Sequence, residues 1–211
     1  GVAEILRDRA VDVERLEVLR GPQGTLYGRN ATGGSINVVT REPTEDVSGY
    51  VSVAAGNYNR IGLEAALSGP ITDTLSARVA VISNDHDGYG KNLNSGNDID
   101  NANTRGARAT LKWKPTQNLT ALLGADYYRE DDRNNGLHYF GQYNPGSKTT
   151  GVALGGAVAP NVRDINSDRD PFNNRRFWGV TARAELDLGA AVLRSISGYR
   201  HSEYITGSDI D

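Results

Sequence analysis

From Gly49 onward, apolar and polar residues alternate over segments of about ten residues, the length that a tilted strand needs to cross a bilayer. Side chains of a β-strand point alternately to opposite faces, so each segment predicts a strand with one apolar and one polar face. Leu63 and Leu67 share one side of such a segment, and Glu64 and Ser68 share the other. These segments are residues 49–55, 60–69, 74–83, 104–114, 118–130, 176–188 and 191–204.

The connections between the segments also follow a pattern. After a first short loop at residues 56–59, long polar connections at 84–103 and 131–175 alternate with minimal ones. An up-and-down membrane barrel has this pattern, because its periplasmic turns are short and its extracellular loops are long. Greek-key sandwiches rarely sort their loops in this way. The aromatic residues Trp113, Tyr127, Tyr128 and Trp178 fall near predicted strand ends, where interfacial girdles form.

Composition excludes several classes of protein. No apolar stretch approaches the ~18 residues of a membrane-spanning helix, so a bilayer would be crossed by strands. The net charge is -3 without a basic stripe, which disfavours nucleic-acid binding. There is no cysteine, and hence neither a disulfide nor a thiolate metal site. The chain starts at Gly1 and contains no methionine, and we expect it to be an internal fragment.

The first part of the chain, to about Thr44, has a different pattern. A helical turn is predicted at Asp12–Arg15 and another at Thr25–Asn30, with strands at Leu16–Leu19 and Ser35–Thr40. This mixed α/β segment predicts a domain boundary between residues 1–44 and 45–211.

The stretch from Val13 to Pro43, VERLEVLRGPQGTLYGRNATGGSINVVTREP, resembles the end of the plug domain of TonB-dependent outer-membrane receptors. In that family the segment is followed at once by the first barrel strand, as Gly49 follows Pro43 here. The resemblance implies a fragment of a plugged, antiparallel up-and-down transmembrane β-barrel, preceded by part of a small mixed α/β plug. Residues 1–44 would be the C-terminal part of the plug, and 45–211 about seven strands of a barrel of about 22.

The motif makes physical sense at its special residues. Its glycines allow backbone geometry or close approach that a Cβ would forbid, and Pro22 suits the first turn of a short helix. The resemblance places Glu17 and Arg20 to bond the inner barrel wall or each other. The plug-motif residues are Glu17, Arg20, Gly21, Pro22, Gly24, Gly28, Gly33 and Gly34.

The function implied by the resemblance is active uptake of a scarce solute across the bacterial outer membrane. The solute would be a ferric siderophore, a cobalamin or an oligosaccharide, and TonB would pull on an upstream peptide. The full-length protein would be a monomer surrounded by outer-membrane lipid, with no catalytic residue, cofactor or metal site. Two alternatives are a passive porin-like barrel, which needs no plug, and a secreted β-sandwich binding module.

Other candidate sites are weaker. The spacing Gly21-x-x-Gly24-x-x-x-Gly28 matches neither nucleotide-binding glycine motif. The loop 84–88 offers oxygen ligands that calcium prefers, although such residues also favour turns. The histidines His86, His138 and His201 are far apart in sequence, in predicted loops or at strand ends. Three aromatic residues of the long loop 131–175 suit contact with a solute from outside, or simply a mobile surface loop: Tyr139, Phe140 and Tyr143.

Overall fold

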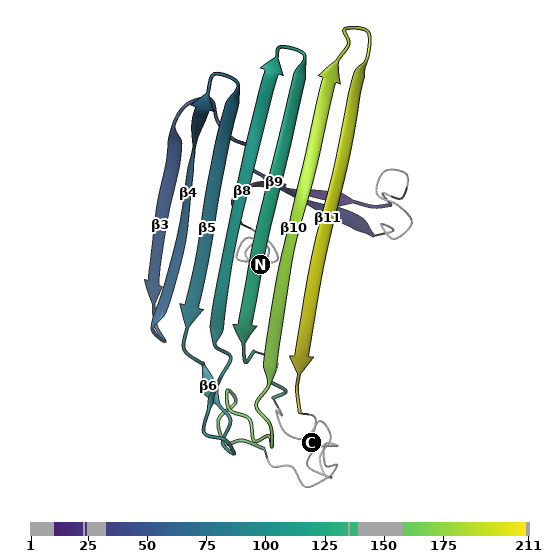
Figure 1. Ribbon diagram of the computed structural model, residues 1–211. Helices are drawn as coiled ribbons and strands as arrows, with labels where there is room; N and C mark the ends of the chain where they lie inside the picture. The colour runs from purple at the N-terminus through teal and green to yellow at the C-terminus, as the bar shows by residue number, and fades with distance from the viewer. Residues whose placement is uncertain (1–10, 23, 25–32, 135, 139–157, 210–211) are drawn as a thin grey trace.

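The computed structural model describes residues 11–22, 24, 33–134, 136–138 and 158–209. Its main feature is one antiparallel sheet in which seven strands follow chain order (Figure 1). The strands are β3 (Ser48–Gly56), β4 (Arg60–Thr72), β5 (Leu75–His86), β8 (Ala102–Thr116), β9 (Leu119–Asp132), β10 (Phe172–Asp187) and β11 (Val192–Gly207). The seven predicted strands and their order are thus confirmed. Most extend further than the alternation predicted.

Short and long connections lie at opposite ends of the sheet, as predicted. Short turns join β4 to β5, β8 to β9 and β10 to β11 at one end of the sheet, the top in Figure 1. The two long connections, after β5 and after β9, lie at the opposite end. The first of them contains a small hairpin that the sequence did not predict, formed by β6 (Gly90–Lys91) and β7 (Asp98–Ile99). The described residues contain no helix with the length and apolar character of a membrane span.

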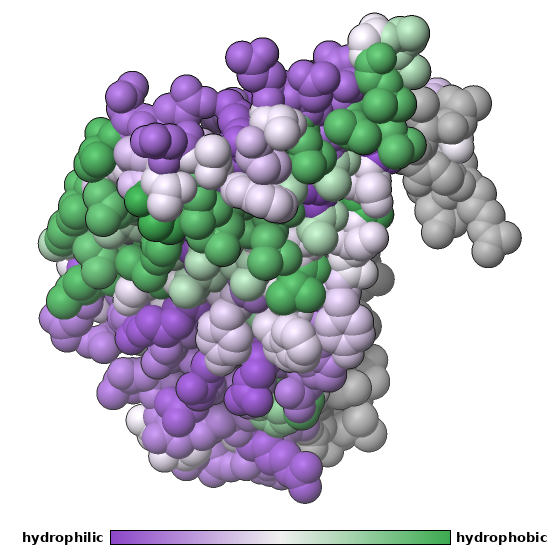
Figure 2. All heavy atoms as spheres, turned by 45° about the horizontal axis from the view of Figure 1, so that its top comes forward, coloured by the Kyte–Doolittle hydropathy of each residue, from purple (hydrophilic) through white to green (hydrophobic). Residues whose placement is uncertain are grey.

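The sheet exposes its apolar face and covers part of its polar face. Val51, Ile61 and Leu67 have exposed fractions of 73%, 61% and 65%, whereas Ser68 and Arg78 on the opposite face have 2% and 5%. A soluble sandwich would bury the apolar face instead, because apolar burial drives its folding. Figure 2 shows the result as a green apolar band with purple hydrophilic residues on both sides of it.

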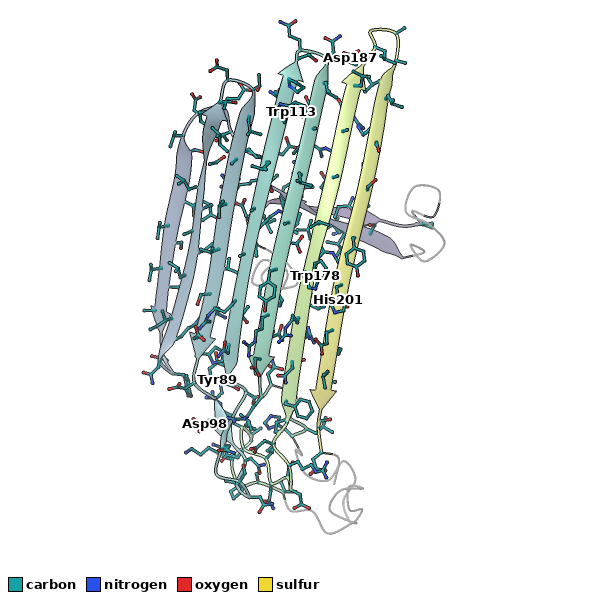
Figure 3. The ribbon with its side chains drawn as sticks, viewed as in Figure 1. Tyr89, Asp98, Trp113, Trp178, Asp187 and His201 are labelled. Atoms are coloured by element: carbon teal, nitrogen blue, oxygen red, sulfur yellow. The ribbon has the colours of Figure 1, made fainter. Side chains whose placement is uncertain are left out.

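Aromatic residues mark the two borders of this band. Trp113 lies near the short-turn end, and Trp178 and His201 lie toward the long-loop end (Figure 3). The Trp178 ring is 5.8 Å from that of His201, centroid to centroid. On β9, the partners of Trp113 and Trp178 are Ala121 and Tyr127, six residues apart. At ~3.4 Å per residue this separation is about 20 Å along the strand.

A second, two-stranded sheet, which we call the inner sheet, lies behind the large sheet, which we call the wall, in Figure 1. It pairs β1 (Val13–Arg20) with β2 (Gly34–Thr40) in antiparallel register. The predicted helical turn at Asp12–Arg15 is therefore wrong: Asp12 has a φ of 61°, and the strand begins at Val13. Pairing with β2 satisfies the backbone of this segment and overrides its local preference. The other predicted helical turn, Thr25–Asn30, lies outside the described residues.

Candidate functional site at the contact between the two sheets

The contact between the two sheets is centred on a buried ion pair. The guanidinium of Arg78 on β5 donates from Nε to Asp12 Oδ2 at 2.5 Å and from Nη2 to Asp12 Oδ1 at 2.6 Å. The two residues are 5% and 2% exposed. The Asp12 carbonyl also accepts a hydrogen bond from the backbone N–H of Arg41. This bidentate arginine–carboxylate pair fixes both the position and the orientation of the Asp12 side chain. It therefore anchors the start of β1 to the wall.

A second set of charges holds the connection between β2 and β3. Glu42 accepts a hydrogen bond from Lys112 Nζ on β8 at 2.9 Å and another from Arg183 Nη2 on β10. Glu45 accepts one from Lys114 Nζ at 2.5 Å. Partial burial by itself would raise the pKa of Glu42, but the hydrogen bonds and positive charges of Lys112 and Arg183 outweigh it and lower that pKa. Glu42 thus bridges two strands of the wall in its charged form.

Acid should weaken this second contact, because the folded protein lowers the pKa of Glu42. The stabilisation is fully present above the ordinary pKa of 4.5 and is lost as the pH falls through the lower folded value. We therefore expect the inner sheet to loosen below pH 4.5 in the wild-type protein. Glu42→Gln should be looser at neutral pH and lose this step, which hydrogen exchange of the β2 amides across a pH series would measure. An unchanged acid step in Glu42→Gln would contradict the assignment.

A small apolar contact lies beside the ion pair. Val11, Ala66 and Ala80 are buried together, with Ile82 packed against them. Gly106 on β8 makes the close approach of Val11 possible, because a Cβ there would lie 2.7 Å from a Val11 methyl and 2.8 Å from Ile82 Cγ1. Sequence reasoning missed Gly106, which the alternation places on the polar face among charged and hydroxyl residues.

Gly106→Val is expected to push Val11 off the wall and strain the neighbouring ion pair. An overpacked core contact typically costs about 1–3 kcal/mol. The measurement is proteolysis of the N-terminal segment in the folded full-length protein, which should become faster. Gly124→Val on the adjacent strand is the control, since the nearest atom to a Cβ at Gly124 is 3.8 Å away. Equal protection in the Gly106 and Gly124 variants would refute this role of Gly106.

Most of the predicted plug-motif residues lie at or beyond the ends of β1 and β2 that are remote from Asp12, whereas Glu17 lies within β1. Gly21 and Gly34 have φ values of 85° and 140°, and a Cβ on Gly34 would clash with the Leu19 carbonyl oxygen. Glu17 forms an ion pair with Arg15 at 2.9 Å. A Cβ on Gly24 or Gly33 would meet no atom of the described residues within 4 Å, and Pro22 follows Gly21 directly. Gly28 lies outside the described residues, and contact of Arg20 with the wall stays a prediction.

The two long connections are tied to one another at the opposite end of the sheet. Asn92 is fully buried, and its Nδ2 donates to the Ser167 carbonyl at 2.9 Å and to Asp170 Oδ1 at 3.0 Å. Asp170 also accepts hydrogen bonds from Ser95 and Asn97. Desolvation would raise the pKa of Asp170, but these donors lower it. The described parts of the loops therefore form one connected rim whose central carboxylate stays ionised.

No group of three or more His, Cys, Asp or Glu side chains that could hold a metal ion occurs among the described residues. His86 contacts the Asp87 carbonyl, His138 Nε2 lies 3.3 Å from Asp100 Oδ2, and His201 stacks on Trp178, so the three histidines remain apart. Tyr139, Phe140 and Tyr143 lie outside the described residues.

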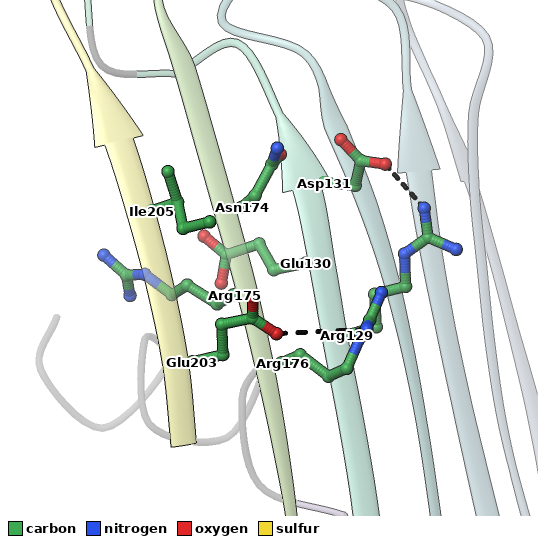
Figure 4. Close-up of a pocket in the computed structure, with 8 residues that line it drawn as sticks. All are labelled: Arg129, Glu130, Asp131, Asn174, Arg175, Arg176, Glu203 and Ile205. Atoms are coloured by element: carbon green, nitrogen blue, oxygen red, sulfur yellow. Dashed lines mark hydrogen bonds and ion pairs between the residues drawn. The ribbon is translucent and has the colours of Figure 1, made fainter.

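A hollow near the loop end of β9, β10 and β11 carries charges on the outward face (Figure 4). Arg129 pairs with Asp131 at 2.6 Å, and Arg176 lies 3.9 Å from Glu203. All four side chains are about half exposed. They lie beyond the aromatic border of the apolar band, where a barrel wall meets the polar headgroups. This hollow therefore belongs to the outer surface of the wall rather than to the contact between the sheets.

Comparison with known proteins identifies relatives along almost the whole chain. No family model matches. The ferric enterobactin receptor PirA of Pseudomonas aeruginosa is 30% identical over 95% of the chain and 31% of its own length. The pesticin receptor of Yersinia pestis is 47% identical over 30% of the chain and 10% of its own length. The chain thus spans about a third or less of the curated relatives it matches.

A solved structure supports the same relationship. The ferric yersiniabactin uptake receptor FyuA from Yersinia pestis superposes with a TM-score of 0.77 and 25% identity, over 93% of this chain and 29% of that one. These relatives are receptors rather than enzymes, in agreement with the expected absence of catalysis. The matches along the chain, the outward apolar band and the inner sheet held on the polar face show that this chain belongs to the TonB-dependent receptor family of the bacterial outer membrane.

Proposed function

We propose that the protein containing this chain takes up a ferric siderophore across the outer membrane, driven by TonB. The supporting observation is that a relative matching 95% of the chain is a receptor for ferric enterobactin. Relatives for ferrioxamine B and ferripyoverdine match 90% and 62% of it. Among the solutes that the sequence left open, ferric siderophores are therefore favoured over cobalamin and oligosaccharides.

The two sheets suit this function. In the proposal, residues 1–44 form part of the plug and residues 45–211 part of the barrel wall. The contacts described above between them are mostly ion pairs, and the apolar contact around Val11 is small. Exposed pairs such as Lys114–Glu45 contribute only about 0–1 kcal/mol, because water competes for the charges. The buried Arg78–Asp12 pair would keep the plug seated at rest, while water competes for the charges of the exposed pairs.

The plug-motif residues are proposed to shape this inner sheet. Gly21 directly follows β1 and Gly34 begins β2, and both adopt a positive φ there. Glu17 and Arg20 are proposed to contact the wall when the plug moves. The β-sandwich alternative does not fit, because the seven long strands form one sheet whose apolar face is exposed rather than packed against a second sheet. A passive porin needs no plug, so it does not account for an inner sheet that a buried ion pair holds against the wall.

The test is uptake of labelled solutes by cells that express the full-length protein, with and without a functional TonB system. The panel contains a ferric tris-catecholate chelate of negative charge, a neutral ferric trihydroxamate chelate, cobalamin and an oligosaccharide. We expect uptake of at least one ferric chelate, abolished when TonB is absent. Uptake that persists without TonB would overturn energised transport, and uptake of cobalamin or oligosaccharide alone would overturn the choice of solute.

A further inference from the structure

Three arginines lie side by side on the outer face of the wall, near its loop end. The register pairs Arg105 on β8 with Arg129 on β9, and Arg129 with Arg176 on β10. Their side chains are 49%, 51% and 54% exposed. Like charges directly opposite one another on a sheet repel, so this arrangement is favourable only with negative charge close by. We call these three residues the arginine row.

The arginine row lies directly beyond the aromatic border of the apolar band. On β9 and β10, Arg129 and Arg176 are the next outward-facing residues after Tyr127 and Trp178, on the side of the long loops. Two residues along a strand correspond to about 7 Å. Because the long loops of a membrane barrel face the exterior, the row is at the level of the headgroups of the outer leaflet.

The carboxylates near the row hold the arginines only weakly. Asp131 accepts a hydrogen bond from Arg129 at 2.6 Å, and Glu203 lies 3.9 Å from Arg176. Both carboxylates are about half exposed, and such pairs contribute little because water competes for the charges. Asp131 is also one outward-facing position nearer to the loops than Arg129. The guanidinium groups can therefore turn to an anion on the bilayer side at little cost.

The arginines and carboxylates surround the hollow shown in Figure 4, which has a volume of about 170 Å³. This volume is below the ~300–1,000 Å³ of usual small-molecule pockets, so the hollow suits one headgroup substituent rather than a whole solute. Asn174 also lines it and adds an uncharged amide donor. The hollow thus combines two guanidinium groups and an amide at one level of the outer surface.

We propose that Arg129 and Arg176 bind a phosphate group of a phosphorylated lipid in the outer leaflet. A guanidinium presents its donors in a planar fork that matches the oxygens of a phosphate. One phosphate between the two arginines would also replace their mutual repulsion by a shared attraction. The acyl chains of the same lipid would lie along the apolar band below the Trp178 ring. This inference concerns a lipid partner and holds whichever solute the receptor carries.

The test measures binding of a bisphosphorylated lipid A to the full-length receptor in a non-ionic detergent, by native mass spectrometry. A basic residue near an anionic lipid surface contributes about 1 kcal/mol, so Arg176→Gln should weaken binding about fivefold. The double variant Arg129→Gln/Arg176→Gln should weaken it about tenfold or more. The control is Arg194→Gln, because Arg194 is 58% exposed and pairs with Glu185 at 2.7 Å, but on the polar face. It should bind as the wild type does.

Two further comparisons test direct contact with the phosphate. Asp131→Asn should bind the lipid at least as tightly as the wild type, because it removes a competing carboxylate. The double variant should bind lipid A and its dephosphorylated form equally, whereas the wild type should prefer the phosphorylated form.

Three results would overturn the proposal. They are equal binding of the two lipid forms by the wild type, an equal loss in Arg194→Gln, and displacement of the lipid by inorganic phosphate at the same concentration, which would indicate a site for small anions. None of these measurements depends on uptake, so failure of the proposed function would leave the lipid site standing.

Discussion

Arg78→Met is expected to release the inner sheet from the wall while the large sheet stays assembled. The substitution leaves the carboxylate of Asp12 without its partner at a position that is 2% exposed. Removing one member of a buried ion pair typically costs about 3–5 kcal/mol, because the remaining charge is left in a poorly solvated place. In the full-length receptor, amide exchange along β1 should accelerate by about a hundredfold or more, since 1.4 kcal/mol corresponds to a factor of ten.

The control uses an ion pair of similar length on the outer face. Arg105 lies 2.5 Å from Asp85, and their side chains are 49% and 36% exposed. Arg105→Met should change β1 exchange by no more than a few-fold, as expected for a solvated pair. The double variant Asp12→Leu/Arg78→Met should recover part of the protection, because neither charge remains. If β1 exchanged at the wild-type rate in Arg78→Met, the anchoring role of the pair would be refuted.

The strands were predictable because their signal is local. Alternation such as that of Leu63, Glu64, Leu67 and Ser68 needs only neighbouring residues to define two faces, and it identified the strands with their apolar and polar faces. The small β6–β7 hairpin was missed because two-residue strands are too short to show alternation.

The candidate site was not predictable in the same way. Arg78 and Asp12 are 66 positions apart, and Arg183 and Glu42 are 141 apart. A charged residue on the polar face of a strand has no local signal that names its partner. The one sequence feature that could have indicated the site was Arg78 itself. It is a long cationic side chain among small residues on a face that would otherwise meet water. Asp12 did have a local signal, but it was misleading. Its preference for a helical turn is overridden by the pairing of β1 with β2.

Leu123→Arg is expected to destabilise the barrel in a bilayer far more than the same change on the polar face. Leu123 is 54% exposed and lies on β9 between the levels of Trp113 and Tyr127, within the apolar band. An arginine facing lipid near the bilayer midplane costs about 2–4 kcal/mol. The measurement is the free energy of unfolding of the full-length receptor in phospholipid vesicles, followed by tryptophan fluorescence during denaturant titration.

Thr120→Arg is the matched control on the same strand. Thr120 belongs to the opposite, polar face and pairs with Glu185 on β10, so the new guanidinium would meet a carboxylate and water. Its expected cost is within about 0.5 kcal/mol, as for an ordinary surface substitution. Equal costs for the two variants would mean that the Leu123 face does not contact lipid. The difference between them would instead show that lipid, rather than a protein core, is what this outward apolar face requires.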